Sequence, residues 1–322
     1  MDIQQLRELR GCPSGDAPAW KARYQPLVAE TLAHRPLEKP RVSVVVVAYN
    51  SHDRVVGCLD HLRAQVGLEA HEIEIILLDN GGLDPARSAF PGRVNLELRM
   101  THNVGLCPAR NLGAALAGAP LISFIDDDGL VKSDYFTRAL RYFETPEIVA
   151  LRSRIVWKEH RYFTSLATHY DRGQDPVDDC LVTEGSSLLR RDVYLEVGGF
   201  ADKLSPYEGL DFSYRLKREK PEARIVYAPD VVMRHDYCDS WQKLWRKSLH
   251  YTSSMRLAED GGPEVREFLQ SYSARRFPKP RWRFDERLAR STLGTLTSAL
   301  RLYGNVTGRR ASYIQSRGAE TG

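Results

Sequence analysis

The sequence predicts an α/β protein built on a mostly parallel β-sheet, and three observations carry that prediction. Three apolar runs, 42–48, 72–78 and 121–125, have the length and composition of strands buried on both faces. The segments 53–65 and 108–117 between them have the apolar spacing or the small residues of helices. Each apolar run ends in polar or flexible residues, as is typical of the ligand-binding edge of a parallel sheet.

The first half of the chain alternates strands and helices. Residues 1–40 show no clear period, so we expect an N-terminal arm with one short helix. From there we predict strands over 42–48, 72–78, 94–100 and 121–125, with helices over 53–65 and 108–117. Strands that alternate with helices indicate parallel βαβ units.

The second half is less regular. We predict strands over 148–157, 181–190, 226–227 and 231–233, and helices over 208–220, 240–257, 264–272 and 286–302. A turn at 197–200 separates the second of these strands from the first of these helices. We therefore expect one domain over 41–236 and a helical C-terminal extension over 237–322.

Composition narrows the class of protein. From Tyr237 to the end there are 16 Lys or Arg and 8 Asp or Glu, an excess of +8, so the rest carries −4 of the net +4. A basic tail predicts contact with an anionic surface, although a solvated helical face is the alternative. The sequence has no apolar run of about 18 residues and no signal-peptide region. Its five scattered cysteines argue against a disulfide framework or a zinc site, and favour a reducing cytosol.

Three consecutive acids, Asp126, Asp127 and Asp128, follow the buried strand 121–125. Their charges repel one another unless a cation lies among them. A hard divalent cation with oxygen ligands satisfies such a group, and it commonly carries substrate phosphates too. The alternative is an acidic turn that caps a helix beginning near Ser133.

Motifs in the order and spacing found here resemble glycosyltransferase family 2. They are Val-Ser-Val-Val-Val-Val-Ala-Tyr-Asn (42–50), Leu-Leu-Asp-Asn-Gly-Gly (77–82), Asn-Val-Gly with Ala-Arg-Asn-Leu-Gly (103–113), Phe-Ile-Asp-Asp-Asp-Gly (124–129), Val-Gly-Gly-Phe (197–200), Glu-Gly-Leu-Asp-Phe-Ser-Tyr-Arg (208–215) and His235. The resemblance covers roughly Arg41 to His235. It implies the GT-A fold, a Rossmann-like mixed, mostly parallel sheet flanked by helices, with a nucleotide-binding half (41–128) and an acceptor half (129–236).

The resemblance also implies a reaction and its cofactor. The expected protein is a metal-dependent inverting glycosyltransferase that moves a sugar from a UDP- or dTDP-sugar to an acceptor hydroxyl. Asp126 and Asp128 match the DxD element that holds Mn²⁺ or Mg²⁺ against the diphosphate, and His235 is the expected third protein ligand. The resemblance assigns donor binding to Ala48, Tyr49, Asn50, Asp79, Asn103, Gly105, Arg110, Asp126 and Asp127.

Two of these donor-binding assignments have structural alternatives. Asp79 matches the family acid that accepts a hydrogen bond from the base, but it could instead cap the turn that follows it. Arg110 could pair with a phosphate through its fork of donors, or it could be an exposed arginine at a helix start. Ala48 replaces the usual Thr of the family, so only its backbone contact survives.

The catalytic base is expected to be Glu208 or Asp211. The family often has Glu-Asp-x-Asp here, but Gly209 occupies the second place, so no Asp base can stand there. Glu208 and Asp211 are three residues apart and share one face of a helix start. Either acid could instead be a carboxylate that the dipole stabilises at the N-terminus of the helix, or an ion-pair partner of Arg215.

The alternative function is a non-catalytic nucleotide-sugar-binding or scaffold protein of the same fold. A nucleotidyltransferase would need a Gly-rich basic loop after the first strand, which 49–52 is not. We expect a glycan, lipid-linked or small-molecule acceptor and no nucleic acid. We expect a cytoplasmic protein, with peripheral contact to the inner membrane face or a homo-oligomer contact through the basic C-terminal helices.

Overall fold

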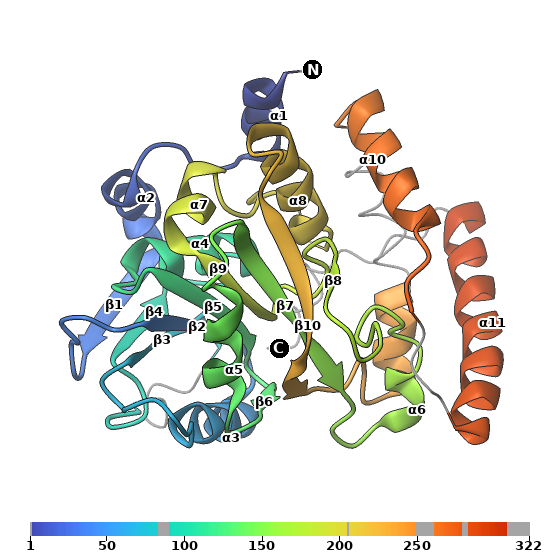
Figure 1. Ribbon diagram of the computed structural model, residues 1–322, viewed down its shortest axis with the longest axis horizontal. Coiled ribbons are helices and arrows are strands. Elements are labelled where there is room, and N and C mark those ends of the chain that lie inside the picture. Colours follow the sequence, from blue (N-terminus) through green and yellow to red (C-terminus); the bar gives the residue numbers. More distant parts are fainter. Residues whose placement is uncertain (1, 83–89, 205, 249–260, 279–282, 308–322) are drawn as a thin grey trace, which may run out of the picture. The chain divides into compact units, whose positions relative to one another are not determined.

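The computed structural model describes residues 2–82, 90–204, 206–248, 261–278 and 283–307 (Figure 1). The chain divides into two compact units, Met1–Arg154 with Gln174–Met233, and Ile155–Gly173 with Arg234–Gly322. The second unit therefore begins near the predicted boundary at 236, but it also takes in residues 155–173. None of the helices in the described segments is long and apolar enough to cross a membrane.

A mixed sheet of ten strands, counted over the described residues, organises the fold. Its four central strands run parallel in the order β4 (Leu96–Met100), β3 (Ile73–Asp79), β2 (Val42–Ala48) and β5 (Leu121–Asp126). Beyond β5, the strand β9 (Ser186–Arg190) is antiparallel to both β5 and β7 (Ile148–Val156). The predicted mixed, mostly parallel α/β architecture is confirmed.

The pairing register brings the ends of the central strands to one level. Ala48 at the end of β2 pairs with Asp79 at the end of β3, and Val47 pairs with Asp126 at the end of β5. All seven residues of β3 and six of the seven in β2 are buried, because helices cover both faces. The polar residues that follow these strands therefore gather at one edge of the sheet.

Helices cover the two faces of this sheet. In Figure 1, α4 (Leu106–Leu116) and α7 (Arg191–Glu196) lie above it, while α3 (His52–Arg63) and α5 (Tyr135–Tyr142) lie below. Helix α4 approaches β2 closely, because a Cβ on Gly113 would lie only 2.4 Å from Val45 Cγ1. Gly113 therefore lets α4 pack directly against β2.

The prediction for residues 1–40 was wrong. They form α1 (Ile3–Arg10), α2 (Ala17–Tyr24), the short helix η1 (Gln25–Leu27) and β1 (Val28–Ala33), which pairs antiparallel with β4. Trp20 is fully buried in the main core. Each helix has only eight residues, too few to show a clear apolar period, so only one short helix was expected in this segment.

Several elements of the second half also differ from prediction. Strand β9 begins at Ser186 rather than at 181, and one continuous strand, β10 (Arg224–Arg234), replaces the two predicted short ones. Pro229 interrupts the apolar pattern there without ending the strand. The short elements β6 (Leu130–Val131), β8 (Val177–Asp178) and α6 (Arg161–Thr164) were not predicted.

The predicted helices of the second half are present as α8 (Glu208–Glu219), α10 (Pro263–Ala274) and α11 (Phe284–Thr307). Residues 241–248 are helical as predicted, and the rest of the helix expected over 240–257 lies outside the described residues. The end of the extension, 308–322, lies outside them as well. The five cysteines, all in described segments, are buried and form no disulfide.

A cluster of aromatic rings supports the carboxyl edge from within the core. It consists of Trp20, Phe124, Tyr194, Phe200 and Phe212, whose ring centroids lie 5.2 to 6.1 Å from their neighbours. These residues come from α2, β5, α7, α8 and the segment between α7 and α8. The cluster therefore ties together the elements that carry the residues at that edge.

Asn111 of α4 holds the segment that leads into α8. Its amide donates to Phe200 O at 2.8 Å and to Asp202 Oδ1 at 3.0 Å. Its carbonyl oxygen accepts from Phe200 N at 3.0 Å and from the Tyr194 hydroxyl at 2.7 Å. A Cβ on Gly199 would lie 2.5 Å from that same oxygen, which explains the glycine in this segment.

We predict that Asn111→Leu lowers the free energy of unfolding by about 3 kcal/mol or more, because it leaves several buried polar groups without partners. Urea denaturation measures this loss. Tyr24→Phe is the graded control: it removes one hydroxyl that bonds Asp202 and Asn111, and should cost about 1 kcal/mol. Equal small losses in both variants would contradict the central role of Asn111.

Candidate functional site

The acidic end of β5 lies against Gly185, the glycine directly before β9. The Asp126 N–H donates to Gly185 O at 3.0 Å. A Cβ on Gly185 would lie 1.9 Å from Asp126 Oδ1, so only glycine leaves room for this carboxylate. The Asp126 side chain is still 36% exposed and can meet a ligand from solvent.

Arg110 is the cation at the centre of the site. It donates to Asp126 Oδ1 at 2.9 Å and to Glu208 Oε1 at 3.4 Å. Its guanidinium lies 5.8 Å from the Phe124 ring centroid and 5.9 Å from that of Phe200. Arg110 is only 4% exposed, so the alternative of an exposed helix-start arginine is wrong. Although burial opposes the change, the charges of Asp126 and Glu208 raise the pKa of Arg110.

Asp127 faces the loop after β2. Its carboxylate accepts from the Ser51 hydroxyl and from the Tyr49 N–H at 3.4 Å. Burial raises the pKa of Asp127 to about 6, a shift that the Ser51 hydroxyl opposes and that the charge of Asp128 reinforces. Asp126 and Asp127 therefore have different contacts: Asp127 fixes the β2 loop, while Asp126 contacts Arg110.

Glu208 is the first residue of α8 and is 4% exposed. One of its oxygens accepts from Arg110, and the other, Oε2, is buried without a hydrogen-bond partner among the described residues. Burial raises the pKa of Glu208 to about 8; the charge of Glu184 adds to this shift and Arg110 opposes it. A buried carboxyl in this state favours its protonated form.

Glu184 joins the same cluster and was missed by the sequence analysis. It lies in the turn just before β9, and its Oε1 accepts from the Gly209 N–H at 2.9 Å. Burial raises the pKa of Glu184, while its backbone hydrogen bonds and Arg110 oppose the shift. The only signal in the sequence was an acid directly before a glycine, Glu184-Gly185, within the segment 181–190 that was predicted as a strand.

Asp211 forms the ion pair with Arg215 that is the structural alternative to its role as a base. Arg215 Nε donates to Asp211 Oδ2 at 2.9 Å, and Arg10 Nε lies 3.8 Å from the other oxygen. Arg215 also donates to Val197 O and Gly199 O. These contacts tie α8 to the segment before it and to α1. The role of Asp211 as a base stays a prediction.

The loops after β3 and β4 are joined by amide side chains. Asp79 Oδ1 accepts from Gly81 N at 3.1 Å and Gly82 N at 3.0 Å, so it does cap the turn that follows. Asn80 Nδ2 donates to Asn103 Oδ1 at 3.0 Å and to Gly105 O at 3.3 Å. The loops predicted to bind the donor through Asp79, Asn103 and Gly105 thus lie together, while their contact with a donor stays a prediction.

The loop after β2 completes this edge. Ala48 O accepts from Asn80 N at 2.8 Å, which links the ends of β2 and β3. Asn50 has a positive φ of 50°, and a Cβ on Gly82 would lie 2.6 Å from Asn50 Oδ1. Tyr49 is half-buried and Asn50 is exposed. Of the residues predicted to bind the donor, all nine therefore lie in the first unit, in the loops at the ends of β2 to β5 or at the start of α4.

His235 belongs to the second unit. Its Nδ1 lies 3.2 Å from the Tyr170 hydroxyl, and its backbone N–H donates to Val156 O at 2.9 Å. The next residue, Asp236, accepts from the backbone N–H groups of 158–160. The role of His235 as a metal ligand stays a prediction.

The acids of the first unit fit a divalent cation by charge and by ligand type. Over the part of the chain that the structure describes, no three His, Cys, Asp or Glu side chains are already arranged around an ion position. However, the charges of Asp126, Glu184 and Glu208 all act on Arg110, and one guanidinium does not balance three ionised carboxylates. Carboxylate oxygens are the ligands that Mg²⁺ and Mn²⁺ accept.

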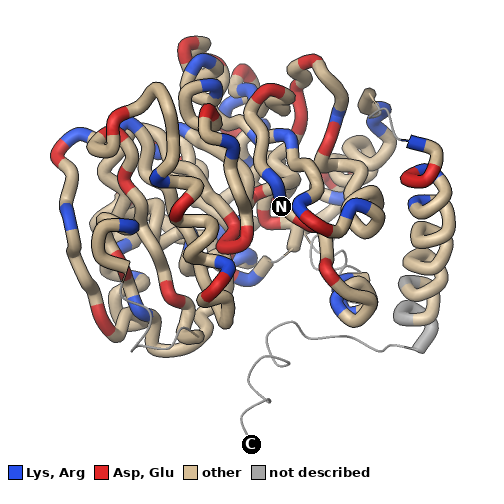
Figure 2. The backbone as a smooth tube through the Cα atoms, turned by 90° about the horizontal axis from the view of Figure 1, so that it is seen from below, with Lys and Arg blue, Asp and Glu red and all other residues tan. Residues whose placement is uncertain are grey.

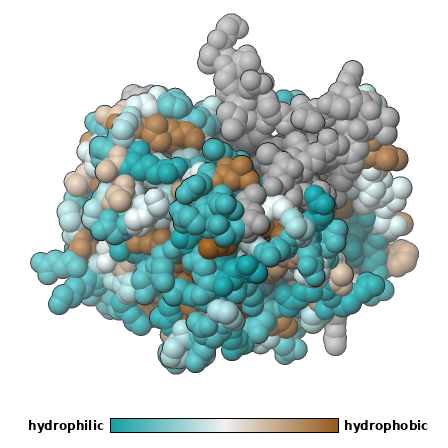
Figure 3. All heavy atoms as spheres, turned by 90° about the horizontal axis from the view of Figure 1, so that it is seen from above, coloured by the Kyte–Doolittle hydropathy of each residue, from teal (hydrophilic) through white to brown (hydrophobic). Residues whose placement is uncertain are grey.

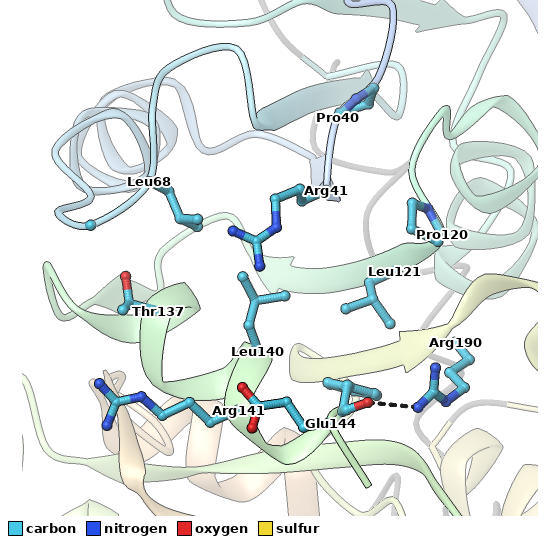
Figure 4. A pocket seen from close by; sticks show the side chains of 12 residues that line it. Pro40, Arg41, Leu68, Pro120, Leu121, Thr137, Leu140, Arg141, Glu144 and Arg190 are labelled. Atoms are coloured by element: carbon cyan, nitrogen blue, oxygen red, sulfur yellow. Dashed lines mark hydrogen bonds between the residues drawn. The ribbon is translucent and has the colours of Figure 1, made fainter. Parts of the chain in front are cut away.

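A pocket of about 440 Å³ lies at the opposite edge of the sheet, by the amino ends of β2 and β5 (Figure 4). Arg41, Arg141 and Arg190 line it together with Glu144. The Arg190 guanidinium donates to the carbonyls of Phe143 and Ile148, so it is committed to the backbone. None of the predicted site residues lines this pocket.

Known proteins resemble this chain in sequence. A family model described as "Glycosyl transferase family 2" matches residues 43–201. The chain is 33% identical over 109 residues to "Putative glycosyltransferase EpsH" of Bacillus subtilis, a match that covers 33% of this chain and 31% of the relative. It is 32% identical over 109 residues to a validoxylamine A glucosyltransferase of Streptomyces hygroscopicus subsp. jinggangensis, covering 31% and 25%. The matches span about a third or less of these relatives.

The fold resembles that of a solved mannosyltransferase, PcManGT from Pyrobaculum calidifontis, in complex with GDP-Man and Mn²⁺. The TM-score is 0.56 at 18% identity, and the match covers 98% of this chain and 91% of that one. S. aureus TarS gives a TM-score of 0.50 at 16% identity, covering 72% and 43%. This likeness concerns the fold alone, and it confirms the predicted GT-A fold.

We predict that Glu208→Gln changes how stability depends on pH. The pKa of Glu208 rises from 4.5 to about 8 on folding, so the folded state binds this proton more tightly. Its stabilising contribution is complete below pH 4.5 and is lost as the pH rises through about 8. The free energy of unfolding of Glu208→Gln, relative to the parent protein, should therefore increase by about 4 kcal/mol between pH 5 and pH 9 in EDTA.

Urea denaturation at the two pH values measures this difference. Glu144→Gln is the control, because Glu144 is exposed and far from Arg110 in the fold. A parallel pH dependence in the parent protein and in Glu208→Gln would contradict a raised pKa for Glu208.

Proposed function

We propose that this chain, which belongs to glycosyltransferase family 2 through its residues 43–201, transfers a sugar from a nucleoside-diphosphate sugar to an acceptor hydroxyl with inversion. The observation that carries the proposal is the acid cluster around Arg110, where Asp126 ends β5 and Glu208 begins α8. Donor chemistry needs a positive partner for a diphosphate, and acceptor chemistry needs a carboxylate. Both kinds of group meet at the ligand-binding edge of the sheet.

The loops after β2, β3 and β4 are proposed to bind the nucleoside. Two backbone N–H groups hold the Asp79 carboxylate in one orientation, and its remaining lone pairs can accept from a base ring. Tyr49 can pack against the base, while Asn103 and Gly105 can face the ribose. UDP- and dTDP-sugars are the expected donors. The GDP-Man complex of PcManGT adds GDP-sugars to the candidates.

Asp126 and Asp128 are proposed to hold Mn²⁺ or Mg²⁺. Such an ion, when bound, stabilises the negative charge of a departing nucleoside diphosphate. The Mn²⁺ in the PcManGT complex supports this choice of cofactor. Within this chain, Arg110 orients Asp126 through their ion pair, and Asp127 keeps the β2 loop against the site.

Inversion requires a base that takes the proton of the acceptor hydroxyl on the face opposite the leaving group. Glu208 is the sequence-based candidate, and Asp211 is the second. The engagement of Asp211 with Arg215 and Arg10 favours Glu208 of these two. A glycan, a lipid-linked sugar or a small molecule can each supply the hydroxyl.

We predict that nucleoside-diphosphate sugars raise the melting temperature of the protein only when Mn²⁺ or Mg²⁺ is present. A donor at about 100 times its Kd should stabilise the folded state by about 2.7 kcal/mol. A thermal-shift panel of UDP-, dTDP- and GDP-sugars, with metal or with EDTA, measures the effect. Asp128→Ala should abolish it.

Asp134→Ala is the matched control for that panel, because Asp134 follows the same loop but forms an ion pair with the surface residue Arg138. It should keep the full metal-dependent response. If no nucleotide sugar gave a metal-dependent shift in the parent protein, the proposed function would be wrong.

We further propose that α11 lies on an anionic membrane surface. It exposes large apolar side chains, with Phe284 82% and Leu288 58% exposed, and also Leu296, Leu302 and Tyr303. Figure 2 shows charged residues of both signs at the start of this helix. Arg287 and Arg290 supply positive charge there, beside the acidic Asp285 and Glu286. Elsewhere the face shown in Figure 3 is largely hydrophilic. Apolar side chains flanked by arginines are typical of interfacial helices.

We predict that the protein sediments with vesicles that contain phosphatidylglycerol, and that high salt or neutral lipid releases it. Replacing Phe284 and Leu288 by Ser should reduce binding at least about tenfold, because it removes roughly 3 kcal/mol of apolar burial. Leu9→Ser is the control, since Leu9 is similarly exposed on α1. Self-association that depends on Phe284 and Leu288, without vesicle binding, would contradict the proposal.

A further inference from the structure

The backbone at position 209 has no room for a side chain. A Cβ on Gly209 would lie 2.0 Å from Leu181 O and 2.2 Å from Glu184 Oε1. The first of these atoms belongs to the backbone, so a simple rotamer change could not relieve the clash. The space beside the second residue of α8 is therefore already filled by the carboxylate of Glu184.

Glu184 is held there by the start of α8. Its Oε1 accepts from the Gly209 N–H at 2.9 Å. The first N–H groups of a helix have no partner within the helix, and its N-terminus carries partial positive charge. Both effects favour an ionised carboxylate at this place, and α8 is a full helix of 12 residues.

Glu208 is in the opposite situation. Its Oε2 is buried without a hydrogen-bond partner among the described residues, whereas Glu184 is less buried. An unsolvated oxygen without a donor is the less favourable place for negative charge. Burial also raises the pKa of Glu208, and the neighbouring charge of Glu184 adds to the shift. The pair is thus arranged so that Glu208 holds a proton while Glu184 carries the charge.

We propose that Glu184 is the carboxylate that takes the proton of the acceptor hydroxyl, from the space that a side chain at position 209 would otherwise fill. This inference rests on the proposed function. In the transfer step, the acceptor oxygen bonds to the anomeric carbon and the bond from that carbon to the diphosphate oxygen breaks. The electron pair of the broken bond stays on the diphosphate, and the proton passes to a Glu184 oxygen.

The test measures turnover and donor binding separately. Turnover is followed as release of nucleoside diphosphate when water serves as the acceptor, with the nucleotide sugar that gives the largest metal-dependent thermal shift. Glu184→Gln should lower this rate at least about 100-fold, the loss typical of a removed general base. The metal-dependent thermal shift should stay, because the variant keeps the size of the side chain.

Chemical rescue separates a proton acceptor from a structural residue. Glu184→Ala leaves space for a small carboxylate, so added formate should restore part of the lost turnover. Glu74→Gln and Glu74→Ala are the matched controls. Glu74 is also buried and also accepts a backbone N–H, that of Gly118 at 2.8 Å, but it lies at the opposite edge of the sheet. Formate should not raise the turnover of either control.

Glu208→Gln completes the comparison, because an amide can take the place of a protonated carboxyl. Its turnover should fall less than that of Glu184→Gln. The inference would be overturned if Glu184→Gln kept turnover within about threefold, if it lost donor binding as well, or if Glu208→Gln were the more damaged. A parent protein that neither binds nor turns over any nucleotide sugar would overturn the proposed function itself.

Discussion

The imbalance of charge around Arg110 is the constraint on which the rest of the site depends. One buried guanidinium faces the carboxyls of Asp126, Glu184 and Glu208. A protein interior does not tolerate two unpaired negative charges at little cost. The cluster must therefore hold protons or gain positive charge from a ligand. The raised pKa of Glu208 meets the first condition, and the remaining charges of Asp126 and Glu184 leave a site that can take up a cation.

Close backbone approach is what brings these acids together. Gly185 lets the Asp126 carboxylate lie against the start of β9, and Gly209 lets Glu184 reach the start of α8. Each glycine removes a Cβ that would collide with a carboxylate oxygen. The hydrogen bonds of Asn111 and the packing of Phe124 and Phe200 then fix the position of Arg110 between the acids. Stability and function thus depend on the same contacts.

The sequence was sufficient for the parts of this site that local patterns encode. The parallel strands β2, β3 and β5 were predictable because they are long apolar runs, and their parallel direction follows from βαβ connections. Asp126, Glu208 and Arg110 were found because they belong to motifs. By contrast, only one short helix was expected where α1 and α2 lie, because eight-residue helices with two buried side chains show no clear period.

Glu184 could not be found in this way, and the reason is topological. Strand β9 runs antiparallel to β5, so the residue before its first position comes beside the last residue of β5. An antiparallel neighbour and a parallel one have the same apolar pattern in sequence, but they bring opposite ends of the strand to the ligand edge. If 181–190 were a strand parallel to β5, Glu184 would lie at the opposite edge of the sheet from Asp126. The antiparallel order places it at the start of α8, where Gly209 leaves the space for it. Gly209 and Glu184 are therefore linked. The glycine that departs from the family pattern leaves the space that the Glu184 carboxylate occupies.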